Sequence, residues 1–139
     1  MTESTGPVPT LAIVLNRDLL FGSRIRSALA SLGLESRFVA TAEQFVAALS
    51  DEPDSVAIGI IDMNGAISWD VISEARSRAD GGHTPTLAFG PHVDIENRRA
   101  AKAAGVSRIV SNGQFHSDAA CLIERYRRRR VTERGLPGN

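Results

Sequence analysis

One stretch of the chain is apolar without interruption and ends on an acid. It covers residues 56–61, Val-Ala-Ile-Gly-Ile-Ile, and Asp62 follows directly. A strand with water on one face alternates apolar and polar residues, whereas a continuous apolar run is typical of a strand that is covered on both faces. The run therefore predicts a central strand of a parallel sheet, with Asp62 at its carboxyl end.

Four further short apolar segments alternate with helical patterns along the chain. The predicted strands are residues 11–15, 36–40, 56–61, 86–89 and 107–110. Apolar residues at helical spacing predict helices over residues 18–32, from 41 to about 50, from 69 to about 80, over 95–104 and from 115 to about 130. Thr41 and Gln44 have the spacing of a capping box, in which each side chain hydrogen-bonds the backbone near the other.

Five strands and five helices in alternation predict an α/β protein with a doubly wound parallel sheet between two helical layers. The element lengths match the flavodoxin-like (βα)5 class, a three-layer sandwich with strand order 2-1-3-4-5. In such sheets the functional residues lie at the carboxyl ends of the strands. Here those positions are held by Asn16, Arg17, Asp18, Asp62, Gly90, His92 and Asn112.

Length and composition limit the class of protein. The 139 residues fit one domain over 9–130, with flexible segments at 1–8 and 131–139. Hydrophobic residues make up 42% and charged residues 23%, which is globular rather than disordered. Cys121 is the only cysteine, so no internal disulfide can form. Because no apolar run reaches the length of a transmembrane segment and no signal region precedes the domain, we expect a cytoplasmic protein.

Several kinds of active site are missing from the predicted rim. No glycine-rich phosphate-binding fingerprint follows the first strand, and no pair of carboxylates is suitably placed for a hydrolase. His83, His92 and His116 are far apart and lack partners at metal-ligand spacing. We therefore expect no enzyme activity, no metal and no cofactor.

The order and spacing of four segments resemble the receiver domains of two-component response regulators. They are the first strand, Leu11 to Leu15; the end of the third, Ile60-Ile61-Asp62; the fourth, Pro85 to Phe89; and the stretch Arg99 to Val106 before the fifth. The resemblance covers roughly residues 9–127. It implies a role in signal transduction or a phosphorelay through protein partners.

In active receivers, an aspartate that ends the third strand accepts a phosphoryl group, and Asp62 matches that position. The resemblance places the other functional positions on residues of the wrong chemistry. The two magnesium-binding acids fall on Asn16 and Arg17, with Asn64 in the same pocket; the hydroxyl falls on Gly90, the switch aromatic on Ile109 and the lysine on Asn112. Asp18 could replace a missing acid only if the loop register shifted.

These replacements favour a pseudo-receiver that works without phosphorylation. Magnesium needs oxygen ligands, and an amide with a guanidinium is a poor replacement for two carboxylates, so Mg²⁺ binding is doubtful. Two interpretations of Arg17 stay open: it fills the place of the metal and pairs with Asp62, or it is solvated while Asp62 accepts backbone hydrogen bonds. The main alternative is a response regulator that is still phosphorylated on Asp62.

The resemblance also implies an interaction face formed by the fourth helix, the fifth strand and the fifth helix. Its residues would be Ile95, Arg99, Arg108, Phe115, Leu122 and Tyr126. Receivers also dimerise through this face, so a homodimer is an open alternative. Residues 125–139 contain six arginines and one glutamate, which suits either a solvated helix end or an adaptor surface for nucleic acid or acidic partners. We favour the solvated end and do not expect nucleic-acid binding.

Overall fold

The computed structural model describes residues 8–77 and 84–129 and contains one five-stranded parallel sheet of order β2-β1-β3-β4-β5. The strands are β1 (Leu11–Leu15), β2 (Glu35–Val39), β3 (Val56–Asp62), β4 (Thr86–Gly90) and β5 (Arg108–Ser111). The helices are α1 (Leu19–Ser31), α2 (Ala42–Asp51), α3 (Trp69–Arg76), α4 (Ile95–Ala103) and α5 (Asn112–Tyr126), with a short 3-10 turn, η1 (Pro53–Ser55). The predicted flavodoxin-like fold and strand order are confirmed.

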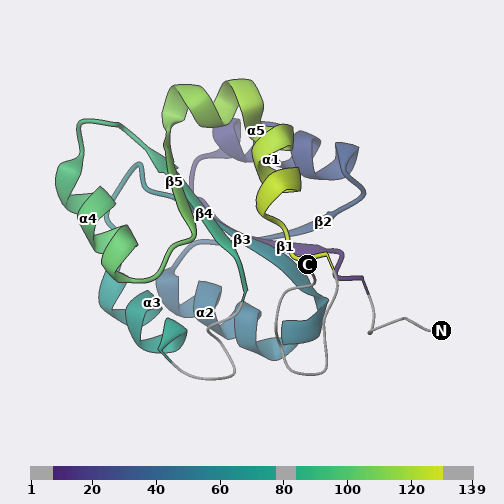
Figure 1. Ribbon diagram of the computed structural model, residues 1–139, viewed down its shortest axis with the longest axis horizontal. Helices are drawn as coiled ribbons and strands as arrows, with labels where there is room; N and C mark the ends of the chain where they lie inside the picture. Colours follow the sequence, from purple (N-terminus) through teal and green to yellow (C-terminus); the bar gives the residue numbers. More distant parts are fainter. Residues whose placement is uncertain (1–7, 78–83, 130–139) are drawn as a thin grey trace.

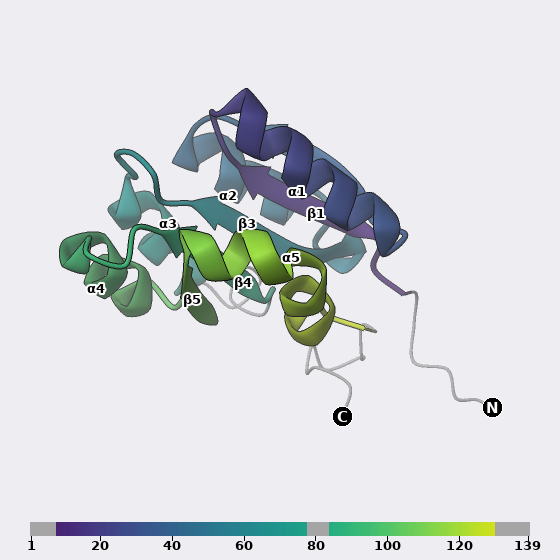
Figure 2. The ribbon, with the colours of Figure 1, turned by 90° about the horizontal axis from the view of Figure 1, so that it is seen from above.

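The sheet lies between two helical layers. Helices α1 and α5 cover one face, whereas α2, α3 and α4 cover the other (Figures 1 and 2). The β3 strand is buried along its whole length and pairs with β1 on one side and β4 on the other, as its unbroken apolar run predicts. Asp62 is therefore carried at the centre of the carboxyl edge.

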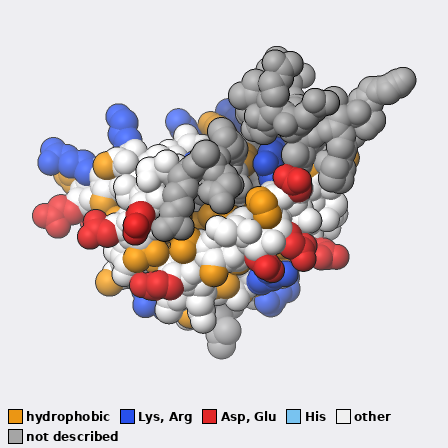
Figure 3. Space-filling model, turned by 90° about the horizontal axis from the view of Figure 1, so that it is seen from below, with side chains coloured by type: hydrophobic (Ala, Val, Ile, Leu, Met, Phe, Trp, Pro, Cys, Tyr) orange, Lys and Arg blue, Asp and Glu red, His pale blue; other side chains and the backbone are white. Residues whose placement is uncertain are grey.

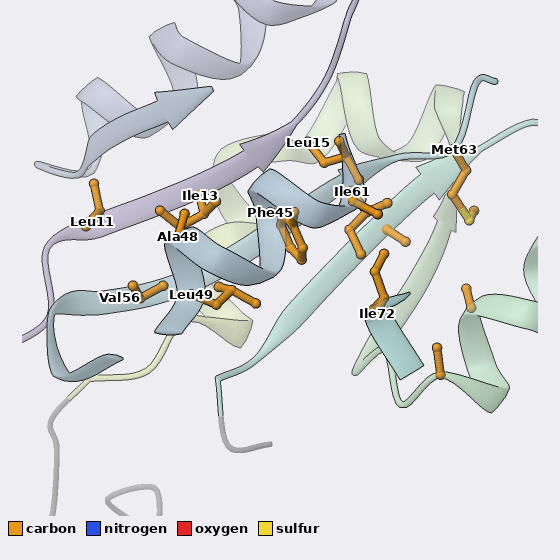
Figure 4. Packing of buried hydrophobic residues seen from close by; sticks show 14 residues of the cluster. Leu11, Ile13, Leu15, Phe45, Ala48, Leu49, Val56, Ile61, Met63 and Ile72 are labelled. Carbon is orange, nitrogen blue, oxygen red and sulfur yellow. The ribbon is translucent and has the colours of Figure 1, made fainter. Parts of the chain in front are cut away.

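Close packing of α2 against β3 depends on a glycine. A Cβ at Gly59 would lie 2.8 Å from Cζ of Phe45 and 3.2 Å from Cγ2 of Thr86. The Phe45 ring, which is fully buried, lies in this space among Ile13, Ile61 and the other apolar residues of that layer (Figure 4). A side chain at position 59 would push α2 off the sheet.

The capping box predicted for α2 is confirmed. Gln44 N donates to Thr41 Oγ1 at 3.0 Å, and Thr41 N donates to Gln44 Oε1 at 3.3 Å. The last helix differs from its prediction, because it begins at Asn112 rather than at 115 and ends at Tyr126 rather than near 130. Ser111 caps its start through a bond from Gln114 N to Ser111 Oγ at 3.1 Å, a signal that the apolar pattern does not contain.

Arg128 has a structural role that the sequence did not indicate. Its side chain is only 8% exposed, and its guanidinium donates to the carbonyl oxygens of Pro53 and Val56. Its backbone N–H donates to Ala57 O at 2.8 Å. The Ala57 carbonyl oxygen is available because Ala57 has no pairing partner on β1: Leu11 pairs with Val56, and the next pair is Ala12 with Ile58.

The arginine run is therefore only partly a solvated helix end. Arg127 and Arg129 both pair with the Glu124 carboxylate, at 3.0 and 2.8 Å, and Arg128 is buried at the amino end of β3. Desolvation lowers the pKa of Arg128, partly offset by Asp54. The two predicted flexible segments, 1–8 and 131–139, fall outside the described residues except for Val8, as does His83. Within the described part of the chain, no helix is both long and apolar enough to traverse a bilayer.

Candidate functional site

Asp62 is held by neutral donors at the carboxyl edge of the sheet. Its Oδ1 accepts from the backbone N of Asn64 at 2.8 Å and from Asn64 Nδ2 at 2.7 Å. Its Oδ2 accepts from Asn16 Nδ2 at 2.7 Å. The side chain is 8% exposed, so these bonds replace most of the water that an aspartate would otherwise bind. Asn16 is thus brought into the site as predicted, but as a hydrogen-bond donor.

Asn64 also joins the Asp62 loop to the start of the last helix. Asn64 Nδ2 donates to Asn112 Oδ1, and Asn112 Nδ2 donates to Asn64 Oδ1, both at 2.9 Å. An amide carries both a donor and an acceptor, so two amides can bond reciprocally. The contact bridges residues 48 positions apart and ties the β3–α3 loop to α5. Asn112, at the lysine position, therefore contacts Asp62 only through Asn64.

Arg17 does not pair with Asp62, so that interpretation of the sequence was wrong. Its Nη2 donates to Ala66 O at 3.0 Å, and the side chain is exposed. The guanidinium lies against Gly65, where an added Cβ would be 3.1 Å from Nη2. Arg17 thus bonds the backbone of the loop between β3 and α3, whereas Asn16 lies next to the Asp62 carboxylate.

Asp18 lines the cleft beside Asp62, but its carboxylate caps a helix. Its Oδ1 accepts from Leu20 N at 2.9 Å and from Phe21 N at 3.4 Å at the start of α1. A side-chain oxygen used in this way satisfies backbone donors that have no partner inside the helix. The register shift that Asp18 would need as a metal ligand is not present.

At Gly90, where the resemblance places the receiver hydroxyl, a neighbouring side chain fills the space. A Cβ at Gly90 would lie 2.9 Å from Met63 Cβ and 3.3 Å from Met63 Cε. Met63 is almost completely buried and belongs to the core beneath α2, α3 and α4. Serine or threonine would therefore not fit at position 90 without moving Met63. Ile109, at the switch-aromatic position, is half-buried against the same core.

A cleft of about 370 Å³ opens beside Asp62 on the side toward β2. Its walls come from the loops after β1, β2 and β3, and its lining includes Asn16, Arg17, Asp62, Thr41, Glu43 and Ser68. Thr41 was predicted only as a helix cap, and Glu43 and Ser68 were not predicted at the site. Their position after the second strand, and before the third helix, is the signal that could have indicated them.

The residues around Asp62 do not suit the magnesium ion that the fold class implies. Two amide groups already direct N–H donors at the carboxylate oxygens that would bind the metal, and Arg17 brings a cation to the mouth of the cleft. The described residues contain no group of three or more His, Cys, Asp or Glu side chains that could hold a metal ion. Magnesium requires a set of hard oxygen ligands.

His116 lies near this edge in an aromatic environment. Its ring centroid is 4.4 Å from that of Phe21 on α1, 5.6 Å from that of Phe89 on β4 and 5.5 Å from that of Phe115. Its Nε2 is buried and has no hydrogen-bond partner. Desolvation, with a smaller effect of Arg24, lowers the pKa of His116, and the negative charge of Asp62 opposes that shift.

The predicted interaction face requires a correction at two positions. Phe115 is fully buried, with its ring stacked on Phe89 at 4.1 Å, and Leu122 is 7% exposed. Both belong to the apolar stripe of α5, which packs on the sheet. Ile95 is 59% exposed, Arg99 and Arg108 are exposed, and Tyr126 is partly buried. The available surface therefore lies on α4 and β5.

Comparison with known proteins identifies the fold. No protein-family model and no curated protein sequence matches the chain. Solved structures do match: the chemotaxis protein CheY4 of Vibrio cholerae has 14% identity and a TM-score of 0.68, over 85% of this chain and 98% of the other. The chain has the fold of response regulator receiver domains. Identities this low establish the fold and leave the chemistry of the site to its own residues.

Two more receiver structures give similar agreement. The receiver domain of the sensor histidine kinase PA1611 of Pseudomonas aeruginosa, which holds a magnesium ion in its active-site cleft, has 16% identity and a TM-score of 0.70, over 85% of this chain and 97% of the other. A response regulator of Hahella chejuensis has 18% identity and a TM-score of 0.69, over 83% of this chain and 92% of the other. The receiver-like portion thus spans nearly the full length of these structures.

Proposed function

We propose that this protein is a receiver-like signalling module that acts through protein contacts and without phosphorylation of Asp62. One observation carries the proposal: the Asp62 carboxylate is held by amides of Asn16 and Asn64 rather than left open to a metal and a phosphodonor. Phosphoryl transfer depends on positioning and on neutralising charge at the transferred group. Around Asp62, the residues that would supply these effects are replaced.

The amide bonds also favour one fixed state of the loop. Asn64 holds Asp62 with one proton of its amide and Asn112 with the other, so the β3–α3 loop is tied to both β3 and α5. Met63 fills the place into which a hydroxyl side chain would project, and Arg17 holds Ala66. The site thus needs no bound group to order it, which suits a module that presents a constant surface.

A phosphodonor assay tests the proposal. The full chain is incubated with acetyl phosphate and magnesium, and phosphate on Asp62 is measured by intact mass and peptide mapping. Asp62→Asn is the negative control, and an active receiver treated in parallel shows that the donor works. We expect no phosphate on Asp62. Substantial labelling of the wild type that is lost in Asp62→Asn would overturn the proposal and favour a phosphorylatable response regulator.

The protein-contact part of the proposal has its own test. Ile95 and Arg99 on α4, and Arg108 on β5, are exposed apolar and basic side chains that a partner can contact. Ile95→Glu with Arg108→Glu should abolish capture of a partner, whereas Ser27→Glu on the exposed part of α1 should not. Light scattering on the same variants separates a homodimer from a heterologous partner. Equal capture by all variants would exclude this surface.

The helical layer that α2 and α3 form with α4 carries charges of both signs. Seen from the side of α2 and α3, acidic side chains lie on both flanks, and the basic ones are scattered among them (Figure 3). The Arg-rich adaptor alternative is also weakened, since Arg127 and Arg129 bond Glu124 and Arg128 is buried. An adaptor for nucleic acid needs arginines that are free to contact phosphates.

A further inference from the structure

Both asparagines of the reciprocal amide pair are followed by glycine. The whole sequence contains two Asn-Gly dipeptides, Asn64-Gly65 and Asn112-Gly113, and the fold brings them together through the two 2.9 Å bonds between their amides. An asparagine before glycine loses its side-chain amide most readily, because glycine has no side chain to shield the backbone nitrogen that attacks. The pairing therefore places two reactive sequences in one contact.

At Asn64 both reacting groups are held. The backbone N–H of Gly65, whose nitrogen would attack, donates to Met63 O at 2.9 Å. The departing nitrogen, Asn64 Nδ2, donates to Asp62 Oδ1 at 2.7 Å and to Asn112 Oδ1 at 2.9 Å. Closing a ring between these groups would require several bonds to break, so the folded protein protects Asn64.

At Asn112 the attacking nitrogen is less constrained. Gly113 lies in the first turn of α5, where backbone N–H groups have no acceptor inside the helix. The capping hydroxyl of Ser111 accepts from Gln114 N and leaves the Gly113 N–H without it. Gly113 is exposed, and a Cβ there would meet no atom within 4 Å apart from its chain neighbours and the backbone of its own helix, so water reaches this peptide.

We propose that Asn112 is a site of spontaneous deamidation, which opens the amide pair and adds a negative charge beside the Asp62 loop. The Gly113 nitrogen attacks Cγ of Asn112 and forms an N–Cγ bond. The Cγ–Nδ2 bond breaks, and Nδ2 departs as ammonia with the proton from Gly113. Water then opens the five-membered imide to aspartate or isoaspartate, and no oxidant or reductant is required.

The product changes the contact with Asn64 in a defined way. A carboxylate only accepts hydrogen bonds, so the bond from Asn64 Nδ2 can remain, whereas the bond that Asn64 Oδ1 accepts is lost. Asn64 Oδ1 and one carboxylate oxygen of residue 112 then face each other with no proton between them. The negative charge is favourable at the N-terminus of α5, so the helix tolerates the product while the loop is released. The inference holds whether or not Asp62 is phosphorylated.

Peptide mapping by mass spectrometry tests where the amide is lost. The full chain is kept at mildly alkaline pH for several weeks, and deamidation is measured separately at Asn64 and Asn112. Gly113→Ala is the matched variant, since its added methyl shields the nitrogen and meets no neighbour. We expect loss at Asn112 to be several-fold faster than at Asn64, and several-fold slower in Gly113→Ala. Equal rates at the two positions, or no effect of Gly113→Ala, would overturn the assignment.

Hydrogen exchange tests the structural consequence. Asn112→Asp carries the product charge, and Gln114→Glu adds the same charge to the same exposed turn outside the amide pair. We expect the backbone amides of residues 64–66 to exchange several-fold faster in Asn112→Asp and at the wild-type rate in Gln114→Glu. Unchanged exchange in Asn112→Asp, or equal acceleration in both variants, would show that deamidation does not release the loop.

Discussion

Asn16 Nδ2 lies 2.7 Å from Asp62 Oδ2 and donates a hydrogen bond across the carboxyl edge of the sheet. Asn16 follows β1 and Asp62 ends β3, so the bond joins two neighbouring strands. The corresponding pair in an active receiver would be two acids that share a metal ion. Here a neutral donor satisfies the carboxylate directly, and the two strand ends are held together without an ion.

Asn16→Ala should lower the free energy of unfolding by about 1.5–3 kcal/mol, because hydrogen bonds to charged groups contribute this much. Asn16→Asp should lower it further at neutral pH, since two carboxylates would then face each other. Urea unfolding followed by circular dichroism measures both. Arg17→Ala is the control and should change stability by less than about 1 kcal/mol, because Arg17 is exposed and bonds only Ala66 O. An Asn16→Asp protein as stable as the wild type would contradict this account of the Asp62 site.

Gly90→Ser should lower stability by about 1–3 kcal/mol through overpacking against Met63. The hydroxyl itself is small, so the loss arises from the Cβ, and Gly90→Ala should show nearly the same effect. The test is a double-mutant cycle with Met63→Ala, which removes the side chain that occupies the space. If the losses of Gly90→Ser and Met63→Ala simply add, the contact does not explain the glycine.

Arg128→Met should destabilise the protein by about 1–3 kcal/mol, since the carbonyl oxygens of Pro53 and Val56 lose their shared donor while the aliphatic stem is kept. Arg125→Met is the matched control in the same run. Its side chain is exposed, so its effect should stay within about 0.5 kcal/mol. The melting temperatures of the two variants are compared by thermal unfolding. A lower melting temperature for Arg128→Met than for Arg125→Met would support a structural role of the buried Arg128. Equal melting temperatures would favour a solvated C-terminal segment.

Stability should fall as the pH is lowered below about 6.5, because of His116. Its pKa is lowered from the ordinary value of 6.5 in the folded state, chiefly by desolvation. Below that pH His116 binds a proton in the unfolded chain but not in the folded one, so protonation favours unfolding. The contribution of neutral His116 to stability is therefore fully present above about pH 6.5 and is lost as the pH falls. Unfolding midpoints between pH 5 and 7 measure the slope.

His116→Phe should flatten that slope, since phenylalanine suits the cage of Phe21, Phe89 and Phe115 and does not titrate. His92→Gln serves as the control, because the His92 side chain is exposed on the loop before α4. It should keep the wild-type slope. A His116→Phe protein with an unchanged slope would assign the pH dependence to another group.

Much of the architecture was contained in local patterns. The unbroken apolar run of β3 and the alternation with helical segments predicted the α/β class correctly, and the capping box of Thr41 predicted the start of α2. The strand order came with the flavodoxin-like class that the element lengths match. These patterns can be recognised in the sequence because burial on one or two faces imposes a characteristic spacing of apolar residues within each segment. The same patterns placed Asp62, Gly90 and Asn112 at strand ends, and so at one edge of the sheet.

Side-chain partners were not contained in those patterns. The sequence allowed Arg17 to pair with Asp62, but Asn16 takes that position and Arg17 turns to Ala66. The reciprocal bonding of Asn64 and Asn112, and the burial of Arg128 under Pro53 and Val56, join residues 48 to 75 positions apart. Phe115 and Leu122 were placed on a surface although the α5 stripe that contains them packs on the sheet.

Sequence alone therefore determined the α/β scaffold and the position of Asp62 at the end of β3. Only the tertiary structure decided the side-chain contacts: an amide network around Asp62, a methionine packed against Gly90 and a buried arginine at the amino end of β3. The physical reason is that periodicity reports which face of a segment is buried, whereas a hydrogen bond depends on distance and direction between atoms that only the folded chain brings together.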